Sequence, residues 1–220
     1  MSEPLVLLPG MGCSADLWAD LDLDAEPLTP VLEEPDLDAE VGRLLASLPR
    51  RFALAGLSLG AIVAMALVRR APERVSRLCL MSTNPYGPTP EQLAGWAEQR
   101  RTLAAGSARG LQTSLLPLLV QRATLHERVL AMADDTGEAR YDAQLRLQAT
   151  RVDERPGLAR ISCPTLVIAA GDDRLCPVAR HEEIARLVPG AKLVVLPGCA
   201  HLSPLEQPVL VSGHLRQWLA

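Results

Sequence analysis

Residues 52–60 read Phe52-Ala53-Leu54-Ala55-Gly56-Leu57-Ser58-Leu59-Gly60, and this stretch decides the fold. Its first four residues are an apolar run typical of a short buried strand, and an Ala-rich apolar segment that predicts a helix continues to about Arg70. The G-x-S-x-G pattern therefore lies at a strand-to-helix turn, where a nucleophile elbow requires it. Such a turn strains the serine backbone and exposes its hydroxyl, while side chains at positions 56 and 60 would collide with the strand or the helix.

Short apolar runs alternate with helical patterns on both sides of this turn. Strands are expected at residues 4–8, 52–55, 75–81, 165–170 and 192–196, with a weaker candidate at 28–32 that contains Pro30. Helices are expected at residues 36–48, 61–70, 177–187 and 205–219. Because the strands are continuously apolar and alternate with helices, the sequence predicts an α/β fold with a sheet of about six mostly parallel strands, flanked by helices.

The alternation stops between residues 84 and 158, where only helical patterns appear. Residues 1–83 and 159–220 together complete the predicted sheet, and neither part does so alone. We therefore expect one core domain, 1–83 and 159–220, with an all-helical cap, or lid, inserted at 84–158. Its Leu-rich stretch at 111–120 is expected to form an apolar wall over Ser58.

A serine nucleophile needs a base, and His201 is the best placed of the four histidines. It follows the strand at 192–196 directly, and loops at the carboxyl ends of parallel strands build the sites of such sheets. His126 lies in the helical insertion, whereas His181 and His214 lie in helical patterns, so the sequence favours surface or structural roles for these three.

Two adjacent aspartates could orient this base. Asp172 and Asp173 both follow the strand at 165–170, in the loop one strand before that of His201. Either could hold the imidazole in one tautomer, and both could also be simple turn formers. The resulting chain order of serine, aspartate and histidine is that of α/β-hydrolases.

A tetrahedral intermediate also needs two backbone N–H donors. The amide of Leu59, directly after the nucleophile, is one candidate. The amide of Met11 is the other, because the flanking residues Gly10 and Gly12 allow close approach after the first strand. The glycines also have alternative interpretations. Residues 9–10 could form a simple turn, and residues 56–60 could be a helix start chosen only for packing. They could also form a phosphate-binding loop, but the sequence has no G-K-[ST] or G-x-G-x-x-G motif to support one.

Taken together, these segments resemble the α/β-hydrolase fold family, and within it the small bacterial esterase-like members with a helical cap. The resemblance covers nearly the whole chain except the insertion. It rests on Leu8-Pro9-Gly10-Met11-Gly12, Gly56-Leu57-Ser58-Leu59-Gly60, Ala71-Pro72-Glu73-Arg74-Val75, Cys163-Pro164-Thr165-Leu166-Val167, Asp173-Arg174-Leu175-Cys176-Pro177 and Gly198-Cys199-Ala200-His201-Leu202.

The resemblance implies that Ser58, Asp173 and His201 are the nucleophile, acid and base. It favours Asp173 over Asp172, because the acid of the family usually lies four residues before a proline that corresponds to Pro177. The chain departs from the family pattern in having proline where histidine often precedes the oxyanion loop, and in a shortened acid loop after Gly171. The first two strands of the family are expected to be absent.

Composition narrows the function further. The chain of 220 residues has a formal net charge of −4 and only 3% aromatic residues, which argues against nucleic-acid binding and predicts a pocket lined mainly by aliphatic side chains. The N-terminus has no basic region before its short apolar run, and the five cysteines include no C-x-x-C pair. We expect a cytoplasmic monomer or homodimer, with no membrane association, no metal and no organic cofactor.

The predicted activity is that of a serine hydrolase cleaving an ester-like bond of a small or medium apolar substrate through an acyl-enzyme on Ser58. The same residues would equally serve a thioesterase, a lactonase or a carbon–carbon bond hydrolase. A non-catalytic ligand-binding protein on the same fold is the alternative from a different class.

Overall fold

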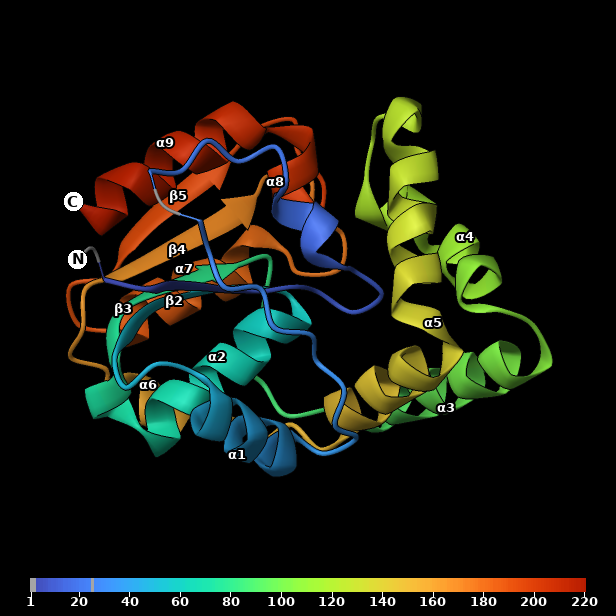
Figure 1. The fold of residues 1–220 in the computed structure, drawn as a ribbon, viewed down its shortest axis with the longest axis horizontal. Coiled ribbons are helices and arrows are strands. Elements are labelled where there is room, and N and C mark those ends of the chain that lie inside the picture. Colours follow the sequence, from blue (N-terminus) through green and yellow to red (C-terminus); the bar gives the residue numbers. More distant parts are fainter. Residues whose placement is uncertain (1–2, 25) are drawn as a thin grey trace.

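A computed structural model describes residues 3–24 and 26–220 (Figure 1). Residues 1 and 2 of the predicted core, and residue 25, lie outside this described part. Five strands form one sheet: β1 (Leu5–Leu8), β2 (Phe52–Leu57), β3 (Val75–Met81), β4 (Thr165–Ala170) and β5 (Lys192–Leu196). They lie in chain order, and every neighbouring pair is parallel.

Nine α-helices accompany the sheet in the described ranges. Their bounds are α1 (Leu37–Ser47), α2 (Leu59–Arg70), α3 (Pro90–Ala105), α4 (Ala108–Leu119), α5 (His126–Ala149), α6 (Arg155–Leu158), α7 (Val178–Leu187), α8 (Ser203–Glu206) and α9 (Pro208–Leu219). Short 3₁₀ helices lie at Ala15–Trp18, Pro72–Arg74 and Ala123–Leu125. None of the helices found in residues 3–24 and 26–220 is long and apolar enough to cross a bilayer.

Alternate strand residues supply the two hydrophobic layers, as the two-residue period of a strand requires. On one face, side chains such as Val6 and Leu54 pack with α1, α2 and α7. On the other face, side chains such as Leu7 and Ala55 pack with α9 and with residues of α4 and α5. Because both faces of the sheet are buried, the strand sequences are continuous apolar runs.

The sheet has five strands rather than about six, because the segment at 28–32 makes only a single parallel bridge, between Leu28 and Val6. Leu28 donates its N–H to the Leu5 carbonyl and accepts the N–H of Leu7. The next bond of a parallel ladder would need an N–H two residues later, at Pro30, which has none. The proline therefore ends the pairing after one residue.

Helices α3 to α6 lie between β3 and β4 in the chain, and α3, α4 and α5 stand to one side of the sheet and its covering helices (Figure 1). They have a small core of their own, built around Trp96, Leu103, Leu111, Tyr141 and Leu145. Helix α5 contains a kink at Gly137, whose φ of 69° and ψ of 163° are not helical. Its first half contributes Val129 and Met132 to the sheet-side layer, so the insertion is docked onto the core.

Candidate active site

Ser58 lies in a strained turn between β2 and α2, with φ of 53° and ψ of −112°. The two glycines of the motif are sterically required. A Cβ on Gly56 would lie 2.4 Å from the Gly60 carbonyl oxygen, and a Cβ on Gly60 would lie 2.1 Å from the Leu8 carbonyl oxygen. The strain is maintained by this close packing of β1, β2 and α2, and it leaves the Ser58 side chain on the wall of a cavity.

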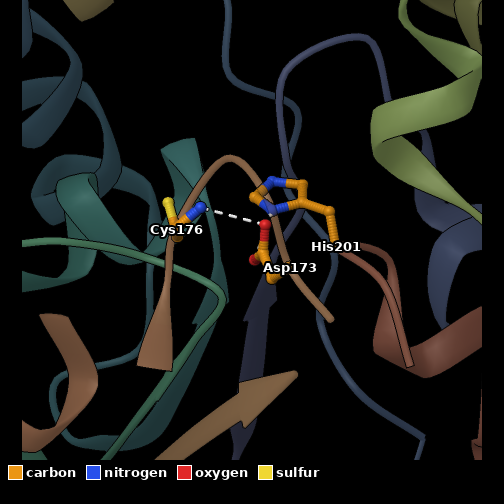
Figure 2. A group of neighbouring side chains, drawn as sticks. All are labelled: Asp173, Cys176 and His201. Atoms are coloured by element: carbon orange, nitrogen blue, oxygen red, sulfur yellow. Dashed lines mark hydrogen bonds and ion pairs between the residues drawn. The ribbon is translucent and has the colours of Figure 1, made fainter. Parts of the chain in front are cut away.

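His201 and Asp173 form a buried hydrogen-bonded pair. The imidazole Nδ1 donates to Asp173 Oδ2 at 2.8 Å, and the two side chains are 4% and 0% exposed. The other carboxylate oxygen, Oδ1, accepts the backbone N–H of Leu175 at 2.8 Å and of Cys176 at 2.9 Å. Figure 2 shows the imidazole and the Cys176 amide nitrogen approaching the carboxylate from two sides.

These contacts set the charge of the pair. Burial by itself raises the pKa of Asp173, but the hydrogen bond and electrostatic attraction from His201 and the two backbone amides outweigh it, so the pKa lies below its usual value. The carboxylate is therefore ionised at neutral pH. Because Nδ1 carries the shared proton, Nε2 of His201 is the basic nitrogen, and the ring lines the same cavity as Ser58.

Asp172 faces elsewhere, although it is adjacent in the chain. Its backbone N–H donates to the Cys199 carbonyl, and its carboxylate accepts from Gln121 Nε2 at 2.8 Å in an exposed position. The structure thus brings Asp173, and not Asp172, to His201.

The two expected oxyanion donors belong to Leu59, which follows the serine in the chain, and to Met11, which lines the same cavity. Leu59 is the first residue of α2, where backbone N–H groups have no acceptor within the helix. Met11 lines the cavity on the loop after β1. The next residue, Gly12, has φ of 66° and donates its N–H to Gln144 Oε1 of α5 at 2.9 Å. Gln144 in turn donates to the Leu32 carbonyl at 2.9 Å, so the insertion holds this loop in place.

Two buried residues that sequence reasoning missed support the site loops. Glu206 accepts the N–H of Ala200 at 2.6 Å and the N–H of Gln121 at 2.7 Å, which fixes the residue before His201. The only available signal was a carboxylate five residues after the predicted base. His181, predicted to be surface or structural, is fully buried and accepts the Thr83 N–H at 2.9 Å. Burial lowers its pKa to about 4, so it is neutral at pH 7.

The cavity has a volume of about 260 Å³, and two kinds of side chain line it. As expected from the composition, aliphatic residues contribute much of it, namely Met11, Leu57, Ile62, Leu115, Leu119, Leu175 and Leu202. The expectation of a mainly aliphatic pocket did not foresee the polar side chains that also line the cavity. These are Asn84, Gln92, Gln99, Gln112, Tyr141, Gln148 and Arg151.

Within the described chain, one group of side chains has the spacing of metal ligands. Ligand atoms of Asp173, Cys176 and His201 lie within 4.8 Å of one another (Figure 2). Both carboxylate oxygens and Nδ1 are already engaged in the hydrogen bonds described above. Burial also raises the pKa of the Cys176 thiol to about 12, which disfavours the thiolate that a metal would need. The donor set therefore fits an orienting hydrogen-bond network better than a metal centre.

Comparison with known proteins identifies similar chains. The alpha/beta hydrolase family matches residues 5–213. The pimeloyl-[acyl-carrier protein] methyl ester esterase of Aromatoleum aromaticum is 29% identical over 238 aligned positions, which cover 94% of this chain and 95% of that protein. The biotin biosynthesis bifunctional protein BioHC of Cellvibrio japonicus is 28% identical, and the chain spans only 46% of its length.

Among solved structures, a thermophilic esterase from Thermogutta terrifontis superimposes with a TM-score of 0.86. The match covers 100% of this chain and 90% of that one, at 23% sequence identity. At this identity the likeness concerns the fold.

Proposed function

Because the chain belongs to the alpha/beta hydrolase family, we propose that it hydrolyses a carboxylic ester through an acyl-enzyme on Ser58. The observation that carries the proposal is the 2.8 Å hydrogen bond between His201 and Asp173, at a cavity whose wall also contains the strained Ser58. The fold and hydrolase class predicted from the sequence are confirmed by the family match. The roles of the individual residues are the subject of the proposal.

In the first half-reaction, Ser58 Oγ attacks the ester carbonyl while His201 Nε2 removes its proton. Asp173 stabilises the resulting imidazolium. The oxyanion accepts hydrogen bonds from the N–H groups of Met11 and Leu59, each worth about 3–4 kcal/mol in comparable sites. When the carbon–oxygen bond breaks, His201 returns the proton to the leaving alcohol and the acyl group remains on Ser58.

Water completes the reaction. His201 takes a proton from the water as it attacks the acyl carbonyl, and then protonates Ser58 Oγ as the carboxylic acid leaves. Side chains and backbone amides of the chain handle every proton and electron pair in this sequence, so the proposal includes no metal and no organic cofactor.

The substrate we propose is a small or medium ester whose body is mainly apolar. The aliphatic part of the cavity wall supports this choice, as does the ester named for the Aromatoleum aromaticum relative. Residues of α3, α4 and α5, and Arg151 after α5, line the same cavity as Ser58, which supports a lid role for the insertion at 84–158. All five cysteines are free thiols, in keeping with the proposed cytoplasmic location.

A fluorophosphonate probe tests the nucleophile directly. We expect one covalent adduct, located on Ser58 by peptide mass spectrometry, and no adduct on a Ser58→Ala variant that keeps its circular dichroism spectrum. An adduct on another residue, or none on the wild type, would refute the proposal. A panel of p-nitrophenyl esters, acyl-thioesters and lactones then separates ester hydrolysis from the chemistries that the same residues could support.

A further inference from the structure

Arg151 introduces a positive charge into the cavity without a negative charge to balance it. It follows α5, is only 5% exposed and lines the cavity that contains Ser58. No Asp or Glu is among the lining residues, and in the described part of the chain no carboxylate lies within salt-bridge distance of Arg151. Buried charges in proteins are normally paired, so we expect the positive charge of Arg151 to bind an anionic group.

The guanidinium is nevertheless held in a fixed position. Its Cζ lies over the Trp96 ring, 5.0 Å from the centroid, and Nη2 donates to Gln92 Oε1 at 2.8 Å. That oxygen also accepts the Thr89 N–H at the start of α3, which fixes it in turn. These neighbours orient Arg151 but carry no charge. Burial accordingly lowers the pKa of Arg151.

Several other polar atoms in the same wall are buried without a hydrogen-bond partner among the described residues. They are Arg151 Nε, Gln112 Nε2, Gln99 Oε1 and Gln148 Oε1. All four side chains line this cavity. Gln112 Oε1 accepts the Tyr141 hydroxyl at 2.7 Å, which leaves its amide N–H₂ free to donate. Since buried polar atoms in native proteins are rarely unpaired, their convergence on one cavity points to a ligand with a polar group there.

We propose that Arg151 binds a carboxylate carried on the acyl part of the substrate, at the end remote from the ester. The preferred substrates would then be monoesters of dicarboxylic acids, with an aliphatic middle that fits the apolar wall. A monoanion is favoured over a phosphate dianion because Arg151 is the only lysine or arginine among the lining residues. Placement on the acyl part lets Arg151 hold the group through both half-reactions. This inference rests on the ester hydrolysis proposed above.

The test compares two substrates that share the p-nitrophenyl ester and the aliphatic chain and differ at the remote end, which is a carboxylate in one and a neutral methyl ester in the other. The kcat/KM of mono-p-nitrophenyl adipate is measured against that of its neutral methyl ester, p-nitrophenyl methyl adipate, with the uncatalysed rates subtracted. In the wild type we expect the charged ester to be preferred by about 10- to 100-fold, the usual contribution of a charge-assisted hydrogen bond. In Arg151→Gln this preference should vanish, because the rate on the charged ester should fall about 10- to 100-fold more than the rate on the neutral ester.

Two further variants keep the result interpretable. Arg151→Lys retains the charge without the planar fork and should keep part of the preference, whereas Arg101→Gln, an exposed arginine on α3, should match the wild type. Equal losses on both esters in Arg151→Gln would show a structural role and overturn the proposal. So would a wild type without preference, even if Arg151→Gln did not fold. If the wild type hydrolyses neither ester and Ser58 is not labelled, ester hydrolysis itself fails.

Discussion

The two walls of the cavity are built by different means. The sheet-borne wall is made by backbone constraints: Ser58 at positive φ, glycines packed against carbonyl groups, and Asp173 held by two backbone amides. The helical wall, from α3 to the residues after α5, acts through side chains: glutamines and Arg151, together with Leu115 and Leu119 of α4. The first wall carries the proposed chemistry, and the second carries the proposed choice of substrate.

This difference determines which residues of each wall can be recognised from the sequence alone. A strained turn demands glycine at fixed spacings, so positions 56 and 60 are recognisable from the chain alone. Glutamine and arginine are ordinary helix formers that occupy many solvent-exposed positions. A Gln or Arg turned toward a cavity therefore looks no different in sequence from one turned toward water.

The largest effect is expected at the carboxylate that orients the base. Asp173→Asn would stabilise the wrong imidazole tautomer, and we expect kcat to fall about 10⁴-fold with the fold retained. Asp172→Asn is the matched control, since Asp172 contacts Gln121 at the surface, and its kcat should stay within about threefold of the wild type. Steady-state ester hydrolysis measures both. Similar losses in the two variants would contradict the assignment of Asp173.

Glycine substitutions test the contrast between the two walls. In Gly60→Ala the new Cβ would lie 2.1 Å from the Leu8 carbonyl oxygen, so β1 and α2 must separate. We expect a loss of at least about 3 kcal/mol in the free energy of unfolding, and a loss of activity. Gly95 lies exposed within α3, with nothing within 4 Å of a Cβ, so Gly95→Ala should stabilise by about 0.5–1 kcal/mol. Urea denaturation measures the free energy of unfolding of both variants. An equal change in Gly60→Ala and Gly95→Ala would contradict the contrast between the two walls.

The strands and the elbow could be predicted because their residue patterns follow from burial and sterics. The five strands coincide closely with the apolar runs, since both faces of the sheet are covered. The weaker candidate at 28–32 pairs through one residue only, because Pro30 has no N–H to continue the ladder. In the site, the segments of Ser58, Asp173 and His201 were recognisable because each follows a strand.

The contacts that Glu206, His181 and Arg151 make could not be predicted. Their roles depend on which distant backbone groups or cavity they face, and that depends on packing between segments far apart in the chain. Glu206 reaches the amide of Gln121, and Gln144 of α5 reaches the amide of Gly12, across separations of 85 and 132 residues. No local pattern encodes such pairings.

A pH titration probes the buried histidine behind the site. Above pH 6.5 the His181 ring is neutral in both the folded and the unfolded chain, so it adds no pH dependence. Between pH 6.5 and about 4 the unfolded chain binds a proton that the folded chain excludes. The free energy of unfolding therefore decreases as the pH is lowered through this range. The total loss expected near pH 4 is about 3 kcal/mol. The His181→Gln variant cannot titrate at this position, so its free energy of unfolding, measured by denaturation, should lack this decrease. Plots of the free energy of unfolding against pH that run parallel for the wild type and the variant would contradict the prediction.

The smallest effect concerns the bond that joins the two walls. Gln144→Ala would leave the Gly12 N–H and the Leu32 carbonyl unpaired, loosening the loop that presents Met11. Because Gln144 itself is not among the cavity-lining residues, we expect kcat to fall about tenfold while KM changes little. Arg146→Ala, at an exposed position of the same helix, is the control. If Gln144→Ala instead raised KM with kcat unchanged, the insertion would act only on substrate binding, and the oxyanion loop would not depend on it.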